Sequence, residues 1–105
     1  MKLYVVVRSD LSRSQQAVQA GHALAELLLW GPAQRISRQW NNHTLVYLRV
    51  RDLESLEQLK ASLDKYQQYP VAFREPDIDD EMTAFALFES DHVGAMGLLS
   101  SLPLV

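Results

Sequence analysis

Apolar residues in this chain form short continuous runs that alternate with longer segments of helical periodicity. Residues 2–8 are apolar and largely β-branched between two basic ends, which is typical of a strand buried on both faces. Further runs predict strands over residues 43–50, 69–75 and 81–88.

The residues that follow the first predicted strand indicate a helix. Ser12 and Gln15 have the spacing of a capping box, and the helix that they begin is expected to extend to about Leu29. Gly31 and Pro32 follow at the positions where a helix ends.

Later segments complete the pattern. Residues 33–42 are expected to form a polar connection with one helical turn at residues 35–39. Asp52 is expected to start an amphipathic helix, and residues 90–101 to form a last helix that two glycines weaken. The apolar residues 102–105 either complete the core or form a dimer seam.

The resulting order is β-α-β-α-β-β-α. Strands that alternate with helices are usually parallel neighbours joined by right-handed crossovers, which places helices on both faces of the sheet. The short link between the third and fourth strands predicts an antiparallel pair. We therefore predict an α/β fold in one domain over residues 1–105, a three-layer α/β/α sandwich with a mixed four-stranded sheet.

Composition narrows the class of protein. The chain has no cysteine, which excludes disulfides and thiolate chemistry. No apolar run approaches the roughly 20 residues of a membrane helix, and the start is too short for a signal peptide, so a cytoplasmic protein is expected.

Charge is unevenly distributed along the sequence. The net charge of −3 combines seven basic and two acidic residues in residues 1–51 with three basic and eleven acidic residues in residues 52–105. An acidic total disfavours broad adhesion to nucleic acid, but an arginine-rich face from the first half can still bind a few phosphates.

Polar side chains recur on one face of the first predicted helix, where Gln15, Gln19, His22 and Glu26 are spaced 4, 3 and 4 apart. His22 is either a general base or a structural helix histidine. His22 and Glu26 lack a third ligand, so no metal is expected. Gly21 costs about 1 kcal/mol in a helix interior, which suggests that a close approach requires it.

Two loops follow the predicted strands at the ends where ligands bind in open α/β sheets. They span residues 9–14 and 75–80, and we expect them to share one cleft with the helix face. Residues 76–81 are either an exposed turn or the source of a carboxylate that activates water beside Thr83. Arginines 8, 13 and 74 either face solvent or hold a substrate. No glycine-rich phosphate loop, nucleophile elbow or zinc motif is present.

The stretch LYVVVRSDLS…QQAVQAGHA resembles the opening of the type-II peptidyl-tRNA hydrolase family, with an Arg-x-Asp-Leu strand end and a Gln-x-x-His-Ala helix. NHTLVYLRVRDLESLEQL and PVAFREPDIDDEMTAFAL are similar to its later elements. The resemblance implies an α/β/α sandwich with one antiparallel strand, a cytosolic and often dimeric protein, and cleavage of the ester that joins peptide to tRNA. It implies tRNA as partner. No cofactor is expected, and the lack of a long apolar run predicts no membrane association.

The family's proposed catalytic residues are a lysine, an aspartate and a threonine. By resemblance Gln15 occupies the lysine position, Glu75 or Asp77 the aspartate position, and Thr83 the threonine position. Gln19 and His22 match the helix motif, and the missing positive charge is expected from Arg13 or Arg8. Two alternatives stay open: a domain that binds tRNA, another RNA or a protein without hydrolysis, and an unrelated hydrolase or transferase with His22 as base.

Overall fold

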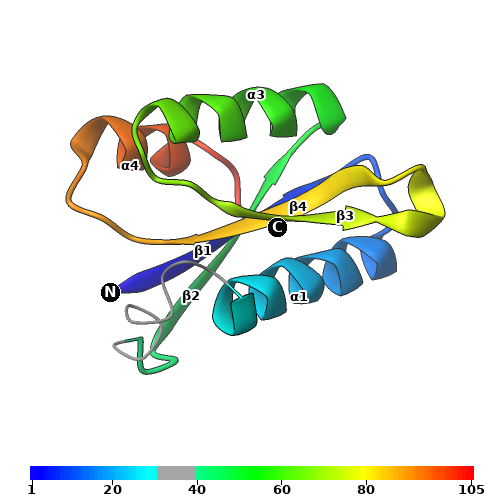
Figure 1. The fold of residues 1–105 in the computed structure, drawn as a ribbon, viewed down its shortest axis with the longest axis horizontal. Coiled ribbons are helices and arrows are strands. Elements are labelled where there is room, and N and C mark those ends of the chain that lie inside the picture. Colours follow the sequence, from blue (N-terminus) through cyan, green and yellow to red (C-terminus); the bar gives the residue numbers. More distant parts are fainter. Residues whose placement is uncertain (31–39) are drawn as a thin grey trace.

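The computed structural model describes residues 1–30 and 40–105, which contain one four-stranded sheet (Figure 1). Its strands are β1 (Lys2–Arg8), β2 (Thr44–Val50), β3 (Val71–Glu75) and β4 (Glu81–Phe88). The strand order is β2-β1-β4-β3; β1 is parallel to β2, and β4 is antiparallel to both of its neighbours. The predicted mixed sheet and the antiparallel pairing of β3 with β4 are confirmed.

Helices cover both faces of this sheet. They are α1 (Arg13–Trp30), α3 (Leu53–Lys65) and α4 (Val93–Ser100), and a short 3-10 helix, η1 (Pro76–Ile78), lies between β3 and β4. Figure 1 shows α1 on one side of the sheet and α3 with α4 on the other. The predicted three-layer α/β/α arrangement is therefore confirmed.

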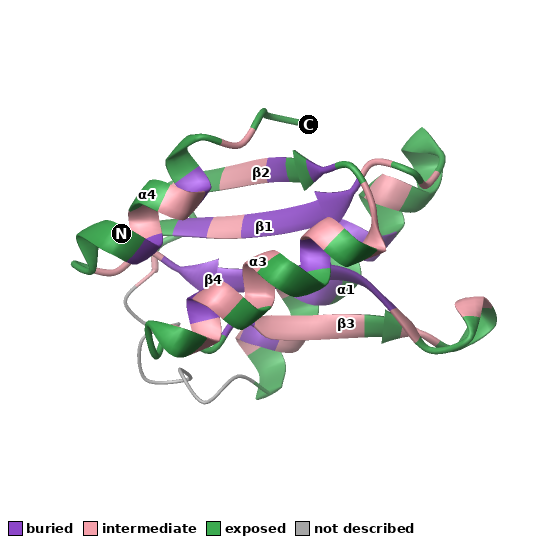
Figure 2. Cartoon of the chain, turned by 90° about the horizontal axis from the view of Figure 1, so that it is seen from above, coloured by how far each residue is buried: buried purple, intermediate pink, exposed green. Residues whose placement is uncertain are grey.

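The central strand β1 contributes to two hydrophobic cores because its side chains alternate between the faces. Val6 packs with leucines of α3 and with Phe85, whereas Val5 and Val7 pack with alanines of α1. These three valines are almost fully buried, as the purple β1 in Figure 2 shows. The continuous apolar pattern of this strand is thus explained by burial on both sides.

Small residues of α1 bring the helix close to the sheet, but the glycine is not among them. Ala20 and Ala23 are buried against the sheet. Gly21 is exposed, and a Cβ added there would meet nothing within 4 Å. The expectation that a close approach requires Gly21 is wrong, because residue 21 lies on the solvent side of the helix.

The ends of the helices follow local capping chemistry. The Ser12 hydroxyl accepts the backbone N–H of Gln15 at 3.2 Å, just before α1 begins. Asp52 accepts the N–H of Ser55 at 2.9 Å and caps α3, as predicted. The predicted stop at residues 31–32 and the helical turn at residues 35–39 lie outside the described residues.

The C-terminal residues pair with the outer edge of β2. The Val105 N–H donates to the Tyr47 carbonyl at 3.1 Å, and the Arg49 N–H donates to the Pro103 carbonyl at 3.0 Å. The side chain of Leu102 packs on the core, whereas those of Leu104 and Val105 are exposed. This segment therefore covers a sheet edge with its backbone rather than filling the core.

The strands β1, β2 and β3 run in the same direction, since β3 and β1 are both antiparallel to β4. Their carboxyl ends therefore lie at one edge of the sheet, beside the first turns of α1. None of the helices within residues 1–30 and 40–105 combines the length and apolar character that crossing a bilayer requires.

Candidate functional site

A pocket of about 290 Å³ lies between the first half of α1 and the carboxyl end of β3. We call it the Glu75 pocket. Its lining comprises Gln15, Val18, Gln19, His22, Glu75, Asp77 and Ile78. The helix residues among them are spaced at 3 and 4, so the helical period places them on one face. The other three lining residues come from the end of β3 and from η1; they are Glu75, Asp77 and Ile78.

A buried amide connects the pocket to the interior of the sheet. Gln19 is 1% exposed, and its Oε1 accepts the hydroxyl proton of the fully buried Thr83 at 2.7 Å. Its Nε2 donates to Glu75 Oε2 at 2.9 Å and to Gln15 Oε1 at 3.2 Å. A carboxylate only accepts, so the NH₂ group must face Glu75 and the carbonyl must face Thr83.

The environment of Glu75 favours its ionised form. The pKa of the Glu75 carboxyl is lowered, chiefly because Gln19 donates a hydrogen bond to it, and further because the Asp77 N–H donates at 3.3 Å. The nearby His22 lowers it too. Glu75 therefore presents a carboxylate to the pocket at neutral pH, where it can accept a hydrogen bond from water.

His22 also lines this pocket, and an aromatic contact holds its ring. Its ring stacks on that of Phe73, with centroids 4.4 Å apart and planes 13° from parallel. The side chain is exposed, so the imidazole nitrogens are accessible to a molecule bound in the pocket. Phe73 was not among the predicted site residues, and Val18 and Ile78 were also missed; helical spacing from Gln15 identifies Val18.

Asp77 occupies the rim of the pocket. Its side chain is exposed, and its backbone N–H donates to Glu75 Oε1 at 3.3 Å. Of the two carboxylates that fit the family's aspartate position, Glu75 is the one bonded to the Gln19–Thr83 pair.

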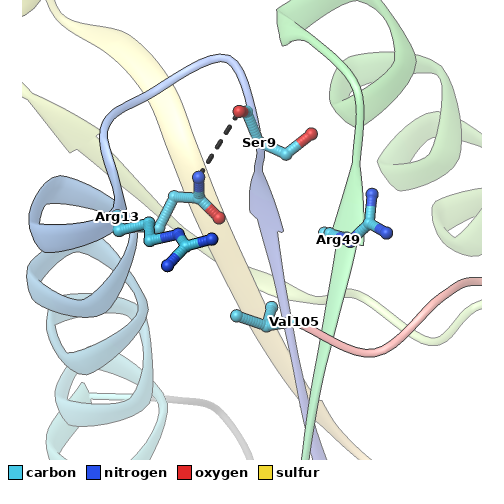
Figure 3. A pocket seen from close by; sticks show the side chains of 5 residues that line it. Ser9, Arg13, Arg49 and Val105 are labelled. Carbon is cyan, nitrogen blue, oxygen red and sulfur yellow. Dashed lines mark hydrogen bonds between the residues drawn. The ribbon is translucent and has the colours of Figure 1, made fainter.

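The two arginines that were expected to supply the missing positive charge lie outside the Glu75 pocket. Arg8 is 7% exposed and forms ion pairs with Asp10 at 2.8 Å and with Glu81 at 2.7 Å. Arg13 lines a second pocket beside β2 (Figure 3). The loop after β1 therefore does not line the Glu75 pocket, in contrast to the single cleft that we expected. In the part of the chain that the structure describes, no group of three His, Cys, Asp or Glu residues is arranged to hold a metal ion.

Fold and pocket together define an α/β domain with a carboxylate–amide–hydroxyl cluster at the end of its third strand. A sequence model described as peptidyl-tRNA hydrolase PTH2 matches residues 1–83, which include every residue of the Glu75 pocket and Thr83. The chain belongs to the PTH2 peptidyl-tRNA hydrolase family. A search of curated proteins found no match. The cytoplasmic location and the homodimer stay predictions.

Proposed function

We propose that this chain hydrolyses the ester between a peptide and the terminal ribose of tRNA, with Glu75 as the carboxylate that orients the attacking water. The observation that carries the proposal is the ionised Glu75 held by Gln19, which is itself held by Thr83. Membership of the PTH2 family supports the choice of ester.

In this reaction the water oxygen attacks the ester carbonyl while Glu75 accepts a proton from the water. Cleavage of the bond to the ribose oxygen then yields a peptide acid and a free hydroxyl. His22 lines the same pocket and gives a proton to the ribose oxygen as that bond breaks. The proton that Glu75 took from the water then passes to His22, so both groups return to their starting forms. Thr83 and Gln19 act by positioning Glu75, because both side chains are buried. Thr83 donates a hydrogen bond to Gln19, and Gln19 donates one to Glu75.

Gln15 is the neutral substitute for the lysine of the family pattern. Its Oε1 accepts from Gln19, which leaves its Nε2 to donate to the negative charge that develops on the ester oxygen. A neutral donor stabilises that charge less than an ammonium group does. This difference favours a second candidate function, a domain that binds tRNA in the same pocket without hydrolysing it.

Hydrolysis of an N-acetyl-aminoacyl-tRNA by the purified protein, measured beside Gln15→Lys, tests the proposal. We expect turnover by the wild type, and about tenfold higher kcat/KM for the variant, which corresponds to roughly 1.4 kcal/mol of added transition-state stabilisation. Turnover by the variant alone, or by neither protein while both bind tRNA, would contradict hydrolysis by this chain and support the second candidate.

The hydrogen bond from the buried Gln19 amide to Glu75 predicts how activity depends on pH. Gln19→Met removes the donor that lowers the pKa of Glu75, so this pKa is expected to rise. Because Glu75 must be ionised, activity is lost as the pH falls through its pKa. The acidic limb of the kcat/KM profile should therefore move to higher pH. At neutral pH Glu75 stays ionised, and kcat/KM should fall roughly tenfold to a hundredfold because the amide no longer positions the carboxylate.

The matched control for this profile is Gln58→Met on α3, where the amide donates to Glu54 on the surface. It should leave the profile unchanged. A Gln19→Met enzyme with normal folding and an unmoved acidic limb would show that Gln19 does not set the ionisation of the catalytic group.

A further inference from the structure

The second pocket, which we call the Arg13 pocket, has a volume of about 610 Å³, within the range of ligand sites in proteins. Its lining comprises Ser9, Arg13, Gln16, Arg49 and Val105. In Figure 3 Arg13 extends from the first turn of α1 toward the strands, whereas the Arg49 side chain lies on β2 with its guanidinium group directed away from Arg13, and Val105 lies between them. Two cations from different elements thus line one concave surface.

Hydrogen bonds to backbone carbonyls orient two of the side chains that line this pocket, those of Gln16 and Arg49. Gln16 donates from Nε2 to the Leu11 carbonyl at 2.7 Å and to the Ser9 carbonyl at 3.4 Å, the second of which is dashed in Figure 3. Arg49 donates from Nε to the Leu104 carbonyl at 3.2 Å. This bond orients the Arg49 side chain and leaves its two terminal nitrogens for another acceptor.

Neither arginine of the pocket is held in an ion pair in the described part of the chain. Within residues 1–30 and 40–105, no carboxylate lies within ion-pair distance of Arg13 or Arg49. The neighbouring acidic residue, Asp10, is bound by Arg8 through two hydrogen bonds of 2.9 and 2.8 Å. A chain with a net charge of −3 therefore retains a local cationic pocket.

The Arg13 pocket and the Glu75 pocket lie at the same edge of the sheet. Both lie at the carboxyl ends of the parallel strands, the Arg13 pocket beside β1 and β2, and the Glu75 pocket beside β3. Consecutive residues of α1, Gln15 and Gln16, line one pocket each. The two pockets are therefore separated by about the width of one helix, roughly 10 Å, which a polynucleotide can span.

We propose that the Arg13 pocket binds a backbone phosphate of tRNA while the ester of the same molecule occupies the Glu75 pocket. A guanidinium group suits a phosphate because it offers paired N–H donors to the phosphate oxygens, and Arg13 and Arg49 each bring one to the lining of this pocket. The identity of the nucleic acid rests on the proposed function, whereas the presence of an anion site rests on the geometry above.

The test is the binding of deacylated tRNA, measured by fluorescence anisotropy at several KCl concentrations, for the wild type, Arg13→Gln, Arg49→Gln and the double variant. We expect the double variant to raise Kd about tenfold and to lower the slope of log Kd against log salt by about 1, because one phosphate contact is lost. The control is Arg51→Gln, since this side chain is 85% exposed outside the pocket, and it should change neither value.

Deacylated tRNA has no ester to cleave, so this measurement does not depend on hydrolysis. A double variant that melts like the wild type but binds tRNA with the same Kd and salt slope would overturn the phosphate site, whether or not the protein is a hydrolase. A wild type that does not bind tRNA would overturn it as well. An Arg-dependent tRNA affinity without any turnover would support this inference and contradict the proposed hydrolysis.

Discussion

Glu75→Gln is expected to lower kcat for peptidyl-tRNA hydrolysis by about a thousandfold, roughly 4 kcal/mol of transition-state stabilisation. Glutamine has the same shape, and its carbonyl oxygen can still accept the hydrogen bond from Gln19, so the fold should survive. What it lacks is the negative charge that accepts a proton from water. The measurement is single-turnover hydrolysis of an N-acetyl-aminoacyl-tRNA, together with tRNA binding, which should persist.

Asp77→Asn is the matched comparison, because both carboxylates line the same pocket. Asp77 contributes its backbone N–H to Glu75 and has an exposed side chain, so its loss should lower kcat by less than about fivefold, near 1 kcal/mol. The opposite order, with Asp77→Asn inactive and Glu75→Gln active, would assign the water to Asp77 and contradict the role of the Gln19–Thr83 pair.

Arg8→Met is expected to destabilise the fold by about 2–3 kcal/mol. Removing one partner of a buried ion pair costs roughly 3–5 kcal/mol, and here the carboxylates are partly solvated, which reduces the cost. Asp10 and Glu81 are 39% and 34% exposed, and Arg8 also donates to the Met82 carbonyl at 3.3 Å. These contacts tie the end of β1 to the start of β4, just before Thr83, so positioning of the site should suffer as well.

The pH dependence of this effect follows from Asp10. Its pKa is lowered, first by the hydrogen bond from Arg8, so the pair stabilises the fold fully above the unfolded pKa of aspartate, about 3.9. That stabilisation is lost as the pH falls through the lowered pKa of the folded state. Urea unfolding of wild type and variant should therefore converge in strong acid.

Arg51→Met is the control for this prediction. The Arg51 side chain is 85% exposed and lies 3.5 Å from Asp52, and exposed pairs of this kind contribute roughly 0–1 kcal/mol. Equal losses of stability in Arg8→Met and Arg51→Met at neutral pH would show that burial of Arg8 is not what makes its contacts strong.

Local sequence was sufficient for the four strands, for α1, α3 and α4, and for the α1 residues that line the Glu75 pocket. The cap at Asp52 and the valine run in β1 depend on neighbours a few residues away, so spacing alone identifies them. The same holds for the shared helix face of Gln15, Gln19 and His22, because the period of an α-helix is fixed by its backbone hydrogen bonds.

Tertiary structure decided which of these side chains meet. Thr83 reaches Gln19 across 64 residues, and Arg8 reaches Glu81 across 73, because β4 inserts between β1 and β3. Because β3 ends at Glu75 and η1 follows it, Glu75 and not Asp77 receives the hydrogen bond from Gln19, and Arg13 lies in a separate pocket. Helical and strand periods set the face on which a side chain lies, whereas pairing between distant strands depends on how the whole sheet packs, which no local spacing encodes.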